Sequence, residues 1–187
     1  MQVLEKNKKE IEERALKMSE FLRMEYLENC LKKFTDVEIL RYCYSELSRL
    51  YEINVMYTEA IKYIAKFQEV AISPRDRLQA YIREIELLIK SGAYDRVEYC
   101  YSRLAQSATP KEIYEIETKI ITLYKIEGQK FEKTNKNSLA IKVYEKLLKL
   151  VKDSEKTEVK KKLLVLYKKL GRVRESLEIE RELGRII

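Results

Sequence analysis

Apolar and polar residues along this chain follow the period of an α-helix, in segments separated by short polar turns. No segment alternates with the period of a β-strand. Both prolines follow a Ser or Thr and precede an amphipathic run, which is the first helical position, where proline is tolerated. The pattern therefore predicts an all-α fold. We expect helices over residues 3–34, 36–53, 57–72, 74–91, 94–107, 110–133, 138–152, 154–170 and 173–185.

One spacing of residues occurs four times. It begins at a large residue and continues with steps of 4, 2, 3, 4 and 3 positions. The four copies are Tyr51-Val55-Tyr57-Ala60-Ile64-Phe67, Leu88-Gly92-Tyr94-Val97-Tyr101-Leu104, Phe131-Asn135-Asn137-Ala140-Tyr144-Leu147 and Tyr167-Gly171-Val173-Ser176-Glu180-Leu183. Internal recurrence at this period is typical of a stacked array of helical hairpins.

Each position of the repeated spacing has a physical reason. The large residue ends a first helix, and a turn follows in which Gly92 and Gly171 are free to adopt a positive φ. The fourth position holds a small or modest side chain, as at Ala60 and Ala140, where we expect two helices to cross closely. Helix starts agree with this division, because Thr35-Asp-Val-Glu38 and Thr109-Pro-Lys-Glu112 have the pattern of capping boxes.

Two segments carry a resemblance to a known family. Tyr44-x-x-Leu47-Ser48-x-x-Tyr51 and Tyr124-x-x-Glu127-Gly128-x-x-Phe131 resemble the first-helix half of tetratricopeptide repeats, including the small residue of that half. The resemblance covers about residues 36–187 and implies an α-solenoid of about four helical hairpins. The small residues of the second helices lie 37, 43 and 36 residues apart, against 34 in the family, which predicts longer loops or helices here.

The fourteen tyrosines fit this architecture. Nine of them fall on consensus packing positions, so we interpret them as core residues in preference to a platform for stacking bases. They are Tyr44, Tyr51, Tyr57, Tyr81, Tyr94, Tyr101, Tyr124, Tyr144 and Tyr167.

Residues 1–34 stand outside the repeats, which would form a domain over residues 35–187. We expect one helix or a tightly bent pair, with two apolar stripes. One interpretation is an end-cap on the first repeat; the other is a surface that meets a partner or a second copy of the chain, because one neighbour cannot bury both stripes. The candidate oligomerisation residues are Leu4, Ile11, Ala15, Met18 and Leu22.

Charge is unevenly distributed. Lys and Arg against Asp and Glu number 8 and 7 in residues 1–34, 10 and 11 in residues 35–110, and 20 and 13 in residues 111–187. The last segment therefore has a net charge of +7, equal to that of the whole chain. Lysines on a helix can simply favour solubility, or they can form a wall that receives an acidic partner.

The resemblance also implies which positions line a groove. Carried over onto this sequence, they are Tyr42, Ser45, Arg49, Glu52, Gln79, Ile82, Glu86, Ile89, Thr122, Lys125, Gln129, Glu132, Glu158, Lys161, Val165 and Lys168. The candidate partner-binding residues among them are Arg49, Lys125, Lys161 and Lys168. None of the sixteen is Asn, so the carboxylate clamp known in the family is not expected.

No pattern indicates catalysis. The chain has no histidine, no glycine-rich phosphate loop and no nucleophile elbow, so we predict no catalytic residues and no enzyme activity. Cys30, Cys43 and Cys100 are widely spaced and form no C-x-x-C pair, which favours three buried thiols over a metal or redox site. We predict no cofactor and no bound metal.

These observations favour a non-catalytic adaptor that binds a protein through the groove or the N-terminal helix. The alternatives are an RNA- or ribosome-associated factor that uses the basic C-terminal repeats, and a module for homo-oligomerisation. No apolar run approaches the roughly 20 residues that cross a bilayer, and the N-terminus has no signal-peptide core, so we expect a cytoplasmic protein without membrane partners. Frequent Lys, Glu and Ile resemble the composition of proteins from heat-loving organisms.

Overall fold

The computed structural model describes residues 2–106 and 108–184, and these residues form ten α-helices and no strand. The chain divides into two compact units, residues 1–106 and residues 107–187. Unit 1 holds α1 (Lys8–Leu16), α2 (Glu20–Lys33), α3 (Val37–Ile53), α4 (Tyr57–Glu69), α5 (Pro74–Ser91) and α6 (Tyr94–Ala105). Unit 2 holds α7 (Pro110–Lys133), α8 (Asn137–Leu150), α9 (Asp153–Lys169) and α10 (Val173–Gly184). The all-α prediction is confirmed.

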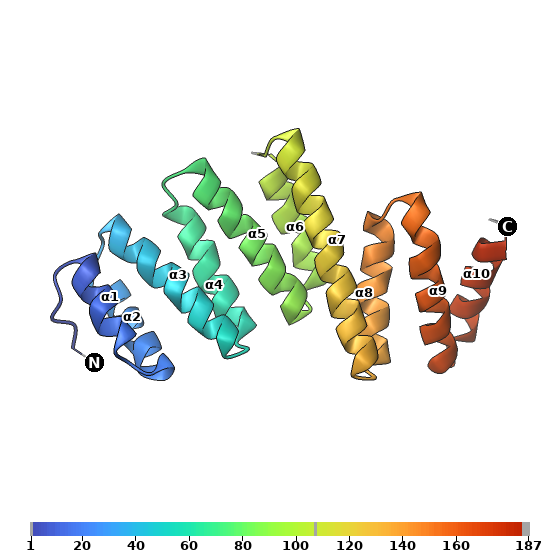
Figure 1. Cartoon of the computed structure of the whole chain (residues 1–187), viewed down its shortest axis with the longest axis horizontal. Helices are drawn as coiled ribbons and strands as arrows, with labels where there is room; N and C mark the ends of the chain where they lie inside the picture. Colours follow the sequence, from blue (N-terminus) through green and yellow to red (C-terminus); the bar gives the residue numbers. More distant parts are fainter. Residues whose placement is uncertain (1, 107, 185–187) are drawn as a thin grey trace. The chain divides into compact units, whose positions relative to one another are not determined.

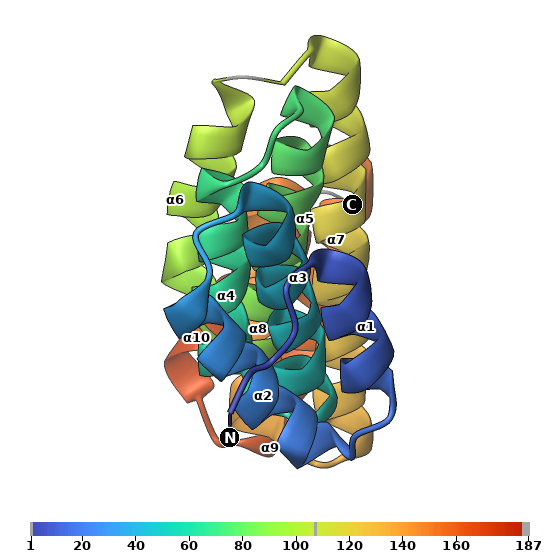
Figure 2. The same cartoon turned by 90° about the vertical axis from the view of Figure 1, so that its left-hand side faces the viewer.

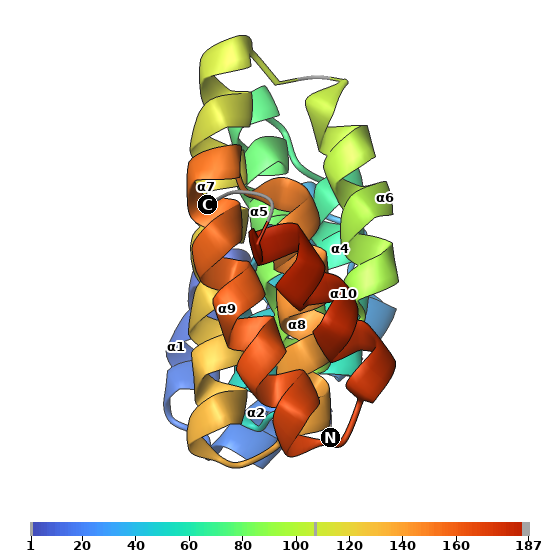
Figure 3. The same cartoon turned by 90° about the vertical axis from the view of Figure 1, so that its right-hand side faces the viewer.

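Consecutive helices pair as hairpins within each unit (Figure 1). In unit 1 the first helices of the hairpins, α1, α3 and α5, lie on one side, and the second helices, α2, α4 and α6, lie on the other (Figure 2). In unit 2 the same division separates α7 and α9 from α8 and α10 (Figure 3). The four predicted hairpins are α3–α4, α5–α6, α7–α8 and α9–α10. Among the described helices none combines the length and apolarity needed to cross a membrane.

The turn inside each of these four hairpins has one geometry. The second position of the repeated spacing has a positive φ in all four, at Val55 (60°), Gly92 (78°), Asn135 (55°) and Gly171 (67°). In each turn the amide one residue further on donates to the carbonyl of the large residue that starts the spacing, at 2.8–3.0 Å. The positive-φ residue donates to the carbonyl three positions before it, at 2.9–3.2 Å. These two bonds are the Schellman motif. The four copies of the repeated spacing therefore have the same backbone structure at the turn.

The predicted helix crossings are also present. Ala60, Val97, Ala140 and Ser176 are all buried, as expected of side chains at a close approach of two helices. In the hairpin α3–α4 the first helix contributes a matching contact, because Ser48 Oγ donates to the Ala60 carbonyl at 3.0 Å. At the position equivalent to Ser48, unit 2 has Gly128.

Residues 1–34 do not form one helix. Residues 2–7 precede α1 without helical structure, and the chain breaks at residues 17–19 into the hairpin α1–α2. Arg23 stabilises the break, because its guanidinium donates to the carbonyls of Ala15 (2.7 Å) and Met18 (3.2 Å) at the end of α1 and pairs with Glu46 of α3 (3.3 Å). The predicted domain boundary after residue 34 therefore falls between α2 and α3, which pack together inside unit 1.

Helix starts follow the predicted caps with one correction. Thr109 and Glu112 form the expected capping box, in which the Thr109 amide donates to the Glu112 carboxylate at 2.8 Å. At the start of α3 the cap is Asp36 in place of Thr35, because the Asp36 carboxylate accepts from the Ile39 amide at 3.1 Å. The predicted helices over 94–107 and 173–185 end within the described residues at Ala105 and Gly184, and their last positions lie outside them.

Candidate functional site

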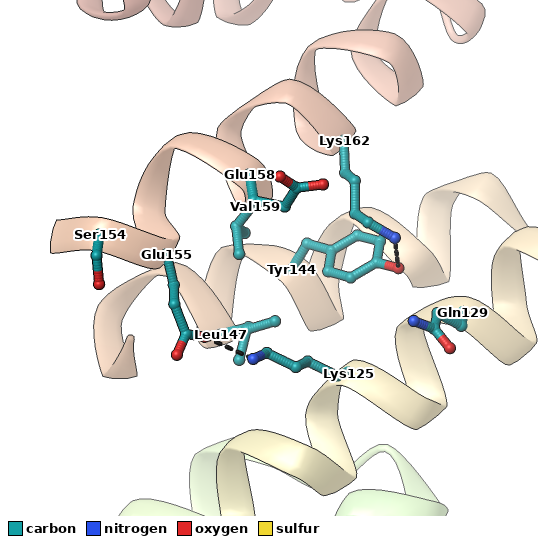
Figure 4. Close-up of a pocket in the computed structure, with 9 residues that line it drawn as sticks. All are labelled: Lys125, Gln129, Tyr144, Leu147, Ser154, Glu155, Glu158, Val159 and Lys162. Atoms are coloured by element: carbon teal, nitrogen blue, oxygen red, sulfur yellow. Dashed lines mark hydrogen bonds and ion pairs between the residues drawn. The ribbon is translucent and has the colours of Figure 1, made fainter. Parts of the chain in front are cut away.

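A pocket of about 480 Å³ lies between the three helices α7, α8 and α9 of unit 2 (Figure 4). Its volume is within the range of typical ligand sites, about 300–1,000 Å³. The lining residues are Lys125 and Gln129 of α7, Tyr144 and Leu147 of α8, and Ser154, Glu155, Glu158, Val159 and Lys162 of α9. We call this site the α7–α9 pocket.

The floor of the α7–α9 pocket is apolar and fixed. Tyr144, Leu147 and Val159 are buried, because Tyr144 and Leu147 occupy the last two positions of the repeated spacing, which face the neighbouring helices. The ring of Tyr144 lies directly against Gly128, where an added Cβ would be 2.6 Å from Tyr144 Cε1. Gly128 is thus required for the position of the tyrosine ring.

An ion pair closes one end of the pocket. Lys125 Nζ of α7 lies 2.5 Å from Glu155 Oε2 of α9 (Figure 4). Both side chains are partly exposed, so the pair adds little to stability by itself. Its geometric effect is to join two walls of the pocket that come from different hairpins.

A network of three side chains holds the other end. Tyr144 donates its hydroxyl proton to Glu132, and Lys162 Nζ lies 3.4 Å from both Glu132 Oε1 and Tyr144 Oη. The ammonium also lies 5.3 Å from the centre of the Tyr144 ring, within cation–π range. Burial, together with the bond to Glu132, raises the pKa of Tyr144 above its ordinary value, so the phenol keeps its proton and acts as the donor.

Two polar side chains of the pocket are not used by these contacts. Gln129 and Glu158 lie on opposite walls, on α7 and α9 (Figure 4). Within the described parts of the chain, neither side chain has a hydrogen bond or ion pair. Both are exposed to solvent and are therefore accessible to a ligand.

The charges that line the pocket cancel. Lys125 and Lys162 contribute two positive charges, and Glu155 and Glu158 contribute two negative charges, so the sum over the lining is 2 − 2 = 0. Each lysine is engaged with a carboxylate, and Glu158 is the charged lining residue without such a partner among the described residues. The pocket therefore differs in character from the surrounding segment, with its net charge of +7.

The four basic residues predicted to bind a partner do not meet in one place. Lys125 lines the pocket, as do Gln129 and Glu158 from the same set of groove positions. Lys161 is exposed and lies outside the lining, while Lys168 pairs with Glu180 of α10 at 2.5 Å. Arg49 belongs to unit 1 and pairs with Glu46 on its own helix at 2.6 Å.

Lys162, which faces the pocket, was missed by the sequence prediction. A signal for it exists in the repeat register. Lys162 and Arg83 are equivalent in the repeat, because each lies five residues before the large residue near the end of its helix. Glu132 and Glu52 are also equivalent, because each directly follows the large residue of the preceding hairpin. Arg83 pairs with Glu52 in unit 1 as Lys162 pairs with Glu132 in unit 2.

The predicted oligomerisation residues do not share one surface. Ile11 and Ala15 are fully buried in the core of unit 1, and Met18 packs against that core, since α1 folds back on α2 and α3. Leu4 and Leu22 remain 65% and 51% exposed. Two further apolar residues beside the α1–α2 turn, Leu16 and Phe21, are also exposed.

The cysteines are buried free thiols. Burial raises the pKa of the Cys100 thiol, and the neighbouring Glu84 carboxylate raises it further, so the unreactive protonated form is favoured. Over residues 2–106 and 108–184, no group of three or more Cys, Asp or Glu side chains is arranged to hold a metal ion.

The chain is similar to known proteins in structure but not in sequence. No family model matches the chain, and no curated protein matches it. The crystal structure of BtubC (BKLC) from P. vanneervenii is similar over 94% of this chain and 76% of that chain, with 13% identity and a TM-score of 0.40. A structure of MamA (AMB-1) is similar over 94% of both chains, with 12% identity and a TM-score of 0.39. The helical-hairpin fold is shown by the helices of the chain itself, and membership in the tetratricopeptide family stays a prediction.

Proposed function

We propose that the protein is a non-catalytic scaffold whose α7–α9 pocket receives a segment of a protein partner. The observation that supports this function is the pocket itself, which has an apolar floor, a polar rim and walls from three helices. Such a site suits one anchoring side chain and the backbone of a bound segment. A cytoplasmic location remains part of the proposal.

The walls of the pocket favour binding because ion pairs between helices fix them in the absence of a partner. Lys125 and Glu155 join α7 to α9 at one end, and Lys162 joins the same helices through Glu132 at the other. A preformed site loses less side-chain freedom on binding than a mobile one. The bound segment would place an aliphatic side chain on Tyr144, Leu147 and Val159.

The test fills the pocket without changing its charge. A tagged full-length chain carrying Gln129→Trp is compared with the wild type in affinity purification from native lysate. We expect the variant to lose a protein that the wild type retains, since the indole would occupy the space above the floor. The matched control is Thr118→Trp, at a neutral and exposed position of α7 outside the pocket. A partner retained equally by both variants would contradict the proposal.

The second candidate function is association with RNA or the ribosome. The net charge of +7 over residues 111–187, together with the exposed Lys161, supports it. The same purification is repeated with nuclease. A captured set that disappears with nuclease, or that consists of ribosomal proteins insensitive to Gln129→Trp, would favour this candidate over the pocket.

A further inference from the structure

We infer that the α7–α9 pocket selects a partner segment in which an arginine or lysine adjoins an aliphatic residue. This inference rests on the proposed function and adds the chemical class of the ligand. It reverses the expectation that a basic groove wall receives an acidic partner.

The two lysines that line the pocket are already engaged with carboxylates. Lys125 is 2.5 Å from Glu155, and Lys162 is 3.4 Å from Glu132 and from the Tyr144 hydroxyl. An acidic ligand would have to displace one of these carboxylates from its lysine. The exchange would replace one ion pair with another and leave a glutamate without its partner, so it offers little net gain.

Two polar side chains of the pocket are open to a ligand. Glu158 on α9 and Gln129 on α7 have no partners among the described residues, and they approach the pocket from opposite sides. A guanidinium carries five donors in a planar fork, which fits the Glu158 carboxylate with two parallel hydrogen bonds and leaves further donors for neutral acceptors such as an amide oxygen. A basic ligand therefore adds a charge-assisted contact without breaking an existing one.

The apolar floor favours an aliphatic residue beside the basic one. Leu147 and Val159 are already buried, so the floor itself loses little further area to a ligand. The apolar area removed from water is mainly that of the ligand's aliphatic side chain, and it supplies the non-directional part of the affinity. The two features together specify a short motif and not merely a charge.

The positive charge of unit 2 opposes a basic ligand but acts at longer range. At physiological salt the Debye length is about 8 Å, so exposed lysines beyond the pocket are largely screened. Contact with Glu158 at hydrogen-bond distance is screened less, because the two charges are much closer than one Debye length. The inference predicts that raising the salt concentration within the physiological range weakens the binding of a basic segment only slightly.

The experiment uses three dipeptide probes and the full chain labelled with ¹⁵N. The probes are acetyl-leucyl-arginine amide, its neutral isostere acetyl-leucyl-citrulline amide, and acetyl-leucyl-glutamate amide. Each is titrated to millimolar concentration while the amide resonances of α7 and α9 are followed. We expect the arginine probe to shift these resonances and to bind roughly two- to fivefold more tightly than the other two, as an ion pair with an exposed carboxylate implies.

Glu158→Gln tests the contact directly. This change should reduce the affinity for the arginine probe roughly to that for the citrulline probe. Glu178→Gln, which removes the same charge from an exposed position of α10, should leave the affinity unchanged. An equal loss of affinity for the arginine probe in the two variants would mean that only the net charge of the protein matters, and it would overturn the inference. Tighter binding of the glutamate probe, or no binding of any probe, would overturn it as well.

The outcomes separate this inference from the proposed function. If Gln129→Trp abolishes capture of the cellular partner while the glutamate probe binds best, the pocket is the partner site and the inferred ligand class is wrong. If Gln129→Trp leaves capture intact, the proposed function itself fails, whatever the probes show.

Discussion

Val55 has a backbone conformation that β-branched residues rarely adopt. Its φ is 60°, and the equivalent positions of two other turns hold Gly92 and Gly171. A left-handed conformation costs an L-residue with a Cβ roughly 1–2 kcal/mol. Because the side chain of Val55 is 67% exposed, its packing contacts offset little of this conformational free energy.

Replacing Val55 with glycine should therefore stabilise the protein. We expect a gain of about 0.5–1 kcal/mol in the free energy of unfolding, as the removed strain exceeds the added freedom of the unfolded chain. Denaturant titration of the full chain measures it. Val165→Gly is the control, since this exposed valine lies inside α9, where glycine should lower stability. A lower stability of Val55→Gly would show that the turn tolerates valine without strain.

At Gly128 a glycine is already present and cannot be replaced freely, because the space beside it is too small for any side chain. An alanine Cβ would lie 2.6 Å from the Tyr144 ring, which Glu132 and Lys162 hold in place. We expect Gly128→Ala to lower the free energy of unfolding by about 1–3 kcal/mol, despite the better helix propensity of alanine. Gly184→Ala, at a glycine with no neighbour within 4 Å of the added Cβ, should not. Equal melting curves for both variants would mean that Tyr144 moves aside freely.

At the scale of an element, α1 depends on a contact with the segment before it. Arg14 Nη1 donates to Glu5 Oε1 at 2.5 Å, and the Glu5 side chain is 11% exposed. Burial by itself would raise the pKa of Glu5, but the bonds from Arg14 and the backbone outweigh it and lower the pKa to about 2. The depressed pKa stabilises the folded state above about 4.5, and this contribution is lost as the pH falls from 4.5 toward 2.

Glu5→Gln should accordingly weaken α1 near neutral pH and have a smaller effect as the pH approaches 2. Hydrogen exchange of the α1 amides measures the local stability directly. Glu13→Gln, which changes an exposed carboxylate on the same helix, is the control and should leave exchange unchanged. An effect of Glu5→Gln that is constant with pH would exclude the ion pair as its cause.

The break between α1 and α2 is a feature that the sequence pattern does not predict. Residues 17–19 contain no glycine or proline, and a helical pattern continues through them. The break is stabilised by Arg23, which reaches the carbonyls of Ala15 and Met18 and connects them to Glu46. Contacts that cross from one element to another are not encoded in local periodicity, so the sequence left open whether residues 1–34 form one helix or a tightly bent pair, and the structure shows the pair.

The turns inside the hairpins are the contrary case. Their register follows from short-range chemistry, namely a large residue at the helix end and a left-handed residue four positions later. The four hairpins and most of their ends were therefore predictable. In α9 the groove positions implied by the family resemblance pointed to Lys161, whereas Lys162 faces the pocket. One residue turns a helix by about 100°, and only the packed neighbours α7 and α8 decide which lysine faces them.

For the molecule as a whole, the exposed apolar residues beside the α1–α2 turn raise the question of self-association. Phe21 is 69% exposed, and Leu16 and Leu22 are exposed as well. We expect the full chain to associate at high concentration and the double variant Phe21→Ser with Leu22→Ser to sediment as a monomer. Leu177→Ser, at an exposed position of α10, should behave as the wild type. Monomers for all three chains at every concentration would exclude association through this hairpin.

The ion pairs Glu52–Arg83 and Glu132–Lys162 give each of the two units a direction. In each, the acid belongs to the first helix of one hairpin and the base to the first helix of the next. The two halves of each pair lie on different hairpins, so a gene segment that encodes both of these hairpins carries the whole pair. Duplication of such a segment would reproduce the pair and, with it, the order of the two hairpins.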